Sequence, residues 1–122
     1  MRATGLIEVE PHTLSHPDFR AERARLAPAA FAALVSRELG GAREMLRARL
    51  GTPADILAWP YGIHDPELEA AARAAGYIAA TALGGRAATA DSPVMAMPRY
   101  QVYEADEGAR FTALLAGKPR RQ

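Results

Sequence analysis

Two of the chain's three histidines, His12 and His16, lie four residues apart. Imidazole nitrogens bind zinc-type ions at about 2.0–2.1 Å, so both rings must converge on one point. An extended segment would hold the two residues roughly 13 Å apart, whereas one helical turn brings such positions to about 5–6 Å. Thr13 and Ser15 favour a turn through side-chain bonds to the backbone. The spacing predicts a metal site if the chain curls after Pro11; the alternative is a polar loop with two unrelated surface histidines.

A second cluster that could do chemistry is Trp59-Pro60-Tyr61-Gly62. Pro60 fixes the backbone and Gly62 permits a sharp turn, which frees the Tyr61 N–H from any sheet ladder. A positioned backbone N–H of this kind can stabilise a developing oxyanion. The simpler interpretation is a turn that ends a strand, with a packed Trp and Tyr.

Alternating segments predict the elements that would carry both clusters. Strands are expected at 6–10, 54–59 and 77–81, followed by an extended segment at 94–102. Helices are expected at 28–50, from Asp65 to Gly76, and from Asp106 to Gly117. This order predicts an α/β fold in which a parallel sheet is flanked by helices. Because both clusters follow predicted strands, they would meet at the same edge of that sheet.

The residues at the expected helix ends are typical caps. Asp65 can cap its helix, with Pro66 at the first helical position. Gly51 suits the end of the helix at 28–50. Gly40 and Gly41 fall inside that helix, where each costs about 1 kcal/mol relative to Ala, so a kink or break could occur there.

Composition limits the class of protein. The chain has 122 residues, the size of one ordinary domain. Its 15 basic and 14 acidic residues give a net charge of +1, which does not favour a nucleic-acid partner. The absence of Cys excludes disulfides, thiolate metal sites and a thiol nucleophile. No apolar segment approaches the ~20 residues of a membrane span, and the first residues lack the apolar core of a signal peptide.

The two clusters together carry a family resemblance. The segment from Gly5 to Phe19 resembles the His-[Ser/Thr]-x-x-His metal motif of the polysaccharide deacetylase family, carbohydrate esterase family 4. The segment 59–62 and the helix that follows it resemble that family's aromatic-Pro-Tyr-Gly block, and 97–100 resembles its late strand. The resemblance runs from about Thr4 to Phe111 and is closest to the branch that acts on poly-N-acetylglucosamine.

The resemblance implies a distorted, TIM-barrel-like (β/α) barrel that hydrolyses N-acetyl, sometimes O-acetyl, groups on glycans. Family members hold a divalent metal, usually zinc, with two His and one Asp. Carried over to this chain, the motif assigns the roles as follows: His12 and His16 bind the metal, Thr13 braces their loop, the Tyr61 N–H serves the oxyanion, and Pro60 and Gly62 support that turn. The side chains of Trp59 and Tyr61 would line the sugar groove. Arg99 could touch the glycan, although pairing with a carboxylate is favoured.

The sequence also departs from the family pattern. The family's Asp-Asp block, which supplies the catalytic base and the third metal ligand, lies upstream of the His motif and has no match here. The downstream Leu-x-His element has no match either. We therefore expect a partial (β/α) barrel of about four strands at 1–117, the C-terminal half of a catalytic domain, followed by a disordered basic tail at 118–122. Possible substitutes for the missing groups, each with a simpler structural role, are Glu8, Glu10, Asp18, His64 and Asp65.

Two hypotheses remain at this stage. The chain could be part of a metal-dependent hydrolase of C–N (non-peptide) bonds that deacetylates N-acetylated glycans, with Zn²⁺ or another divalent transition metal. With two ligands alone that metal would bind weakly, and the isolated chain would be inactive. Alternatively, it is an inactive half-barrel that binds glycan or metal, or only assembles. Exposed sheet edges predict a homodimer in either case. Family members usually act outside the cytoplasmic membrane.

Overall fold

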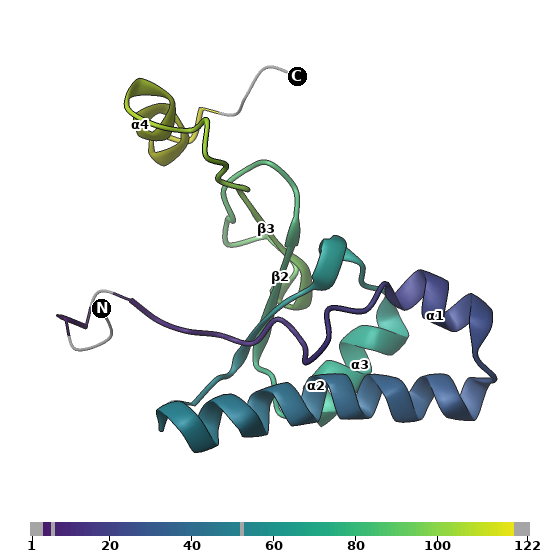
Figure 1. The fold of residues 1–122 in the computed structure, drawn as a ribbon. Helices are drawn as coiled ribbons and strands as arrows, with labels where there is room; N and C mark the ends of the chain where they lie inside the picture. The colour runs from purple at the N-terminus through teal and green to yellow at the C-terminus, as the bar shows by residue number, and fades with distance from the viewer. Residues whose placement is uncertain (1–3, 6, 52, 119–122) are drawn as a thin grey trace.

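The structure is a computed structural model that describes residues 4–5, 7–51 and 53–118. Two 3-10 turns, at Pro60–Gly62 and Val94–Ala96, precede α3 and β3. The helices and strands, in chain order, are α1 (Phe19–Arg25), α2 (Pro28–Leu50), β1 (Ile56–Ala58), α3 (Pro66–Ala74), β2 (Ala79–Leu83), β3 (Met97–Arg99) and α4 (Ala109–Leu115) (Figure 1).

A parallel sheet with the order β1-β2-β3 lies at the centre, as the strand–helix alternation predicted. Helix α3 connects β1 to β2 and packs against α2, whereas α4 projects from the far end of the sheet (Figure 1). Buried side chains of α1, α2, α3 and the strands form one apolar core, whose largest members are Trp59, Phe19, Leu39, Leu57, Leu68 and Met95. The chain is therefore a parallel sheet flanked by helices.

The segment at 6–10, expected to be a strand, differs from the prediction. Leu6 lies outside the described residues, and 7–10 carry no sheet ladder. Next to it, Pro11 pairs through its backbone, since its carbonyl accepts the Ala58 N–H at 2.9 Å. The carboxylate of Glu10 accepts a hydrogen bond from the Ile56 N–H at 3.0 Å. In a four-stranded sheet, the backbone of a neighbouring strand would accept this bond. Three strands are thus formed in the described part of the chain, against the four or so expected.

The predicted bounds of the long helix and its glycine cap are confirmed. Helix α2 has the bounds that the apolar stripe predicted, and Gly51 ends it with a φ of +64°. It runs uninterrupted through Gly40 and Gly41, so the possible break does not occur. Asp65 caps α3 by accepting the Leu68 N–H, and Gly76 follows the helix with a φ of +94°.

Other boundaries shift. Helix α1 was not predicted, although Asp18 is a typical cap that accepts the Arg20 and Ala21 N–H groups. Strand β2 begins two residues later than expected, and most of the segment at 94–102 lies outside β3. Asp106 does not cap the last helix, which begins after Gly108; its carboxylate accepts the Tyr103 N–H instead. Apart from Lys118, the expected tail lies outside the described residues.

No helix in the described ranges has the length and apolar character that crossing a membrane requires.

Candidate metal and oxyanion site

The loop that carries the two histidines curls as the spacing required. Thr13 and His16 adopt left-handed backbone angles, with φ of +66° and +56°. The Thr13 hydroxyl accepts the His16 N–H at 3.1 Å, which closes the turn. The two imidazole rings meet edge to face with their centroids 4.7 Å apart (His12 to His16). The loop therefore has the curl that the spacing required, and it brings the two rings into contact. The roles of His12 and His16 as metal ligands and of Thr13 as a bracing residue stay predictions.

One contact orients the ring of His12. Its Nδ1 lies 2.6 Å from the carbonyl oxygen of Ala58, the last residue of β1. Because a carbonyl oxygen only accepts, Nδ1 must carry the proton in the neutral ring, which leaves the lone pair on Nε2. Metal-binding histidines are commonly oriented in this way by a hydrogen bond from the other ring nitrogen. The contact with Ala58 therefore leaves Nε2 as the acceptor atom of the ring.

The turn after β1 brings Tyr61 beside this loop. The Tyr61 ring lies edge to face with that of His16, 4.5 Å between centroids, and its side chain is 58% exposed. Its backbone has a φ of +54°, a strained conformation for a residue with a side chain. Within the described part of the chain, no group accepts the Tyr61 N–H. The described fold therefore leaves this donor unused, and its role toward an oxyanion stays a prediction.

Pro60 and Gly62 hold this turn. Pro60 is fully buried, and its carbonyl accepts the Ile63 N–H at 3.0 Å. Gly62 has a φ of +68°, and a Cβ there would lie 2.9 Å from the backbone nitrogen of Leu83. A larger residue at position 62 would therefore collide with β2.

Helix α2 contributes a carboxylate that the sequence analysis missed. Glu38 is 1% exposed and accepts three hydrogen bonds from the histidine loop: the Leu14 N–H at 3.0 Å, the Ser15 N–H at 2.8 Å and the Ser15 hydroxyl at 2.9 Å. Burial by itself raises the pKa of this carboxyl, but donation from Ser15, Arg37 and Leu14 outweighs it and lowers the pKa overall. Glu38 is ionised at neutral pH. The available signal was an acidic residue inside the apolar stripe of a long helix.

The same face of α2 receives Leu14 one turn later. A Cβ at Gly41 would lie 2.7 Å from the Leu14 Cδ1, so the glycine makes room for the loop. The glycine that suggested a kink in the helix instead permits a close approach.

The predicted glycan contact of Trp59 and the favoured ion pair of Arg99 need correction, whereas a glycan contact of Arg99 stays a prediction. Trp59 is completely buried, and its indole N–H donates to the Met95 carbonyl at 2.8 Å. A ring enclosed in the core cannot line a sugar groove, because the burial of its large apolar area determines its position. Arg99 does not form the favoured ion pair with any described carboxylate, and its Nε is buried without a hydrogen-bond partner.

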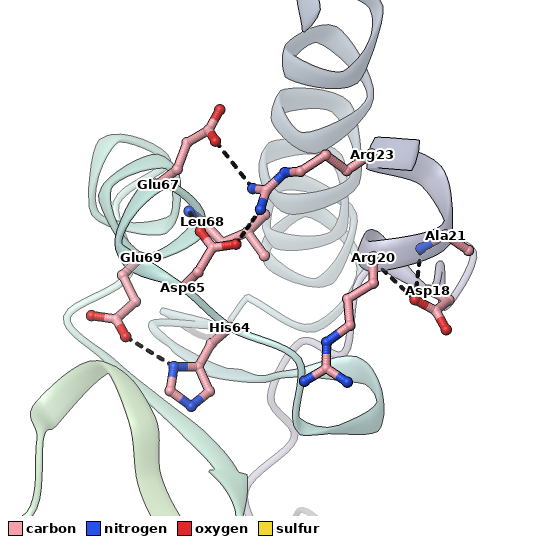
Figure 2. A network of polar contacts seen from close by, with 9 residues as sticks. All are labelled: Asp18, Arg20, Ala21, Arg23, His64, Asp65, Glu67, Leu68 and Glu69. Atoms are coloured by element: carbon pink, nitrogen blue, oxygen red, sulfur yellow. Dashed lines mark hydrogen bonds and ion pairs between the residues drawn. The ribbon is translucent and has the colours of Figure 1, made fainter. Parts of the chain in front are cut away.

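Four of the five possible substitutes for the missing ligand and base have structural roles, and Glu10 has been described above. Figure 2 shows Asp18 capping α1, Asp65 paired with Arg23, and His64 beside Glu69. Burial raises the pKa of Asp65, but donation from Arg23 and from the Leu68 N–H lowers it overall. Among the described residues, no group of three His, Asp or Glu side chains could hold a metal ion. The residues present thus fit two of the ligands of a zinc-type ion.

A family model described as polysaccharide deacetylase matches residues 1–80. No curated protein matches the chain significantly in sequence.

Three solved structures share the fold. A Streptococcus pyogenes deacetylase, PplD in complex with acetate, is 17% identical with a TM-score of 0.69; the match covers 91% of this chain and 44% of that one. A de-N-acetylase from Aggregatibacter actinomycetemcomitans is 18% identical with a TM-score of 0.70, covering 92% and 49%. IcaB from Ammonifex degensii is 23% identical with a TM-score of 0.64, covering 86% and 46%.

The chain spans less than half the length of each of these structures. The TM-scores show that these structures share the fold of the chain. Because the identities are low, the family assignment rests on the family model. Since that model covers most of the chain, including both the histidine loop and the turn at 60–62, this protein belongs to the polysaccharide deacetylase family.

Proposed function

We propose that this chain provides part of the active site of a metal-dependent hydrolase that removes acetyl groups from N-acetylated glycans, with poly-N-acetylglucosamine as the substrate class. The observation that carries the proposal is the convergence of His12 and His16 beside the free N–H of Tyr61. Family membership and the de-N-acetylase among the similar structures support the same reaction.

In this proposal each residue has a defined task. His12, through Nε2, and His16 hold a zinc-type ion, which when bound supplies Lewis-acid chemistry. The Tyr61 N–H donates to the oxygen of the acetyl group as negative charge develops on it. The exposed Tyr61 ring offers an apolar surface to the sugar. The third ligand and the general base come from an Asp-Asp block, which this sequence does not contain.

The experiment is titration calorimetry of Zn²⁺ into the purified chain. We expect weak binding that is lost in His12→Ala and in His16→Ala, because each removes one of two ligands. His64→Ala is the matched control, since the His64 ring bonds to the Glu69 carboxylate. Equal weakening by His64→Ala, or no binding by the natural chain, would contradict the proposal.

A second candidate function is an inactive half-barrel that binds glycan or metal, or only assembles. The lack of a three-residue metal group in the described ranges favours it. Deacetylation of an N-acetylglucosamine oligomer with added Zn²⁺ addresses both candidates. We expect the isolated chain to be inactive, and robust turnover would refute the requirement for the Asp-Asp block. Restored turnover when the natural gene's upstream coding region is included would identify an enzyme.

A further inference from the structure

Glu38 is a buried carboxylate that the proposed reaction does not use. It lies on the core-facing stripe of α2, between the buried residues Val35, Leu39 and Ala42. An ionised carboxylate is rarely buried unless several donors satisfy it. Here most of these donors come from the histidine loop, 23 and 24 residues away in sequence. Arg37, on the same helix, donates one further bond at 3.3 Å. The carboxylate on α2 is therefore satisfied mainly by the loop.

The loop needs such a partner because of its backbone. Thr13 and His16 both have left-handed φ values, and the N–H groups of Leu14 and Ser15 lie between them. A turn of this kind cannot pair those two N–H groups with a neighbouring strand. Glu38 accepts both through one oxygen, Oε2, and the Ser15 hydroxyl through the other. The carboxylate thus fixes the two residues that directly precede His16.

A second contact on the same helix supports this role. Leu14 packs against Gly41, three residues after Glu38, where a Cβ would approach its Cδ1 to 2.7 Å. Positions three apart on a helix share one face. The face of α2 toward the loop therefore combines a carboxylate with a recess, and both engage the segment between the two histidines.

We propose that Glu38 is a positioning residue that holds the loop at 12–16 in the conformation in which His12 and His16 converge on a divalent cation. The inference rests on the proposed function, because it assigns a purpose to the loop geometry. Glu38 acts through the backbone of Leu14 and Ser15 and does not touch the ion. Outer residues of this kind typically change metal affinity about 10–100-fold when removed.

The test compares metal affinity with folding stability in the full chain. We expect Glu38→Ala to weaken Zn²⁺ binding at least about tenfold. Glu38→Gln retains one oxygen but turns an amide N–H₂ toward the loop's donors, so a smaller loss is expected. Ser15→Ala removes one of the three loop bonds and keeps the carboxylate, which makes it the variant of choice if the position-38 variants do not fold.

Leu39→Ala is the control for general destabilisation, because Leu39 is fully buried next to Glu38 on the same helix. It should lower the thermal midpoint at least as much as Glu38→Gln while keeping the Zn²⁺ affinity of the natural chain. The visible absorption of bound Co²⁺ provides a spectroscopic readout of ligand geometry. We expect this spectrum to change in the Glu38 variants and to stay unchanged in Leu39→Ala.

The outcomes separate this inference from the proposed function. If the natural chain binds Zn²⁺ through both histidines but the Glu38 and Ser15 variants bind equally well, the positioning role is overturned and the proposed function stands. If Leu39→Ala loses as much affinity as Glu38→Gln, loss of stability explains the effect and the positioning role is again overturned. If the natural chain binds no Zn²⁺, both fail.

Discussion

At the scale of single residues, Trp59 and Tyr61 differ sharply in burial although they belong to one turn. They are two positions apart in the cluster at 59–62, yet one ring is fully buried and the other is 58% exposed. The Trp59 indole belongs to the core and bonds to the Met95 carbonyl, whereas Tyr61 lies beside the histidine loop. The two rings of the same motif therefore have different surroundings, one in the core and one at the surface beside the histidine loop.

This division predicts unequal costs of truncation. Trp59→Ala should lower the free energy of unfolding by about 3–5 kcal/mol, because it leaves a large cavity in the core. Tyr61→Ala should change it by less than about 1 kcal/mol, since an exposed ring loses little burial. Urea denaturation followed by circular dichroism measures both values. A comparable loss in the two variants would show that the Tyr61 ring also contributes to the core.

The lowered pKa of Asp65 predicts that the stability of the chain depends on pH. Its pKa is lowered in the folded chain from the ordinary value of 3.8, through its bonds with Arg23 and the Leu68 N–H. A carboxylate whose folded pKa is depressed contributes stability above its unfolded pKa and loses it as the pH falls through the folded value. Asp65→Asn keeps a cap but removes the charge.

We therefore expect the natural chain to exceed Asp65→Asn in urea midpoint at pH 6, with the difference vanishing as the pH falls below 3.8. Asp91→Asn, in an exposed loop, is the control for the removal of one carboxylate. A difference between the natural chain and Asp65→Asn that persists unchanged into strong acid would refute the linkage.

At the scale of elements, α2 both builds the core and supports the histidine loop. Its buried stripe packs on the sheet, while Glu38 and Gly41 contact the loop. Gly41 is therefore constrained by a neighbour, whereas a Cβ at the adjacent Gly40 would meet open space. The two glycines have the same helix propensity but different surroundings.

Substitution by alanine should separate them. Gly40→Ala should raise the free energy of unfolding by up to about 1 kcal/mol, because alanine loses less backbone entropy in a helix. Gly41→Ala should give a smaller gain or a loss, since its Cβ would displace the Leu14 side chain. Thermal or urea midpoints measure this. An equal gain at both positions would mean that Leu14 moves aside without cost.

At the scale of the whole molecule, the sheet and α4 leave apolar surface uncovered. Val102, Tyr103 and Leu115 are all more than half exposed, and they lie in or beside the projecting α4. Exposed sheet edges and apolar patches favour association. We propose that the isolated chain forms a homodimer through its exposed sheet edges, and that the contact extends over these apolar side chains.

Light scattering at micromolar concentration should then give about twice the chain mass of 13.1 kDa. Leu115 is 73% exposed, and Leu115→Asp would place a charge in the dimer contact. This variant should therefore shift the population toward monomer. Glu104→Asp, a conservative change in an exposed residue nearby, is the control. A monodisperse monomer for the natural chain would refute the dimer.

The sequence by itself determined the features that depend on neighbours along the chain. The bounds of α2, the cap of α3 at Asp65 and the left-handed Gly51 follow from periodicity and backbone preference, which act within a few residues. The turn between His12 and His16 is likewise local, because the Thr13 hydroxyl accepts the N–H of His16 three residues later. Helix α1 was predictable in principle from Asp18, but its weak apolar stripe concealed it.

Only the tertiary structure decided which distant groups meet. The proton position on His12 depends on a carbonyl 46 residues away, and the histidine loop depends on Glu38 more than 20 residues away. The burial of Trp59 and the replacement of a fourth strand by the Glu10 carboxylate are likewise choices among long-range partners. A residue type limits which bonds a side chain can form. The packing of the whole chain selects which of them it forms, because a buried polar group without a partner costs free energy.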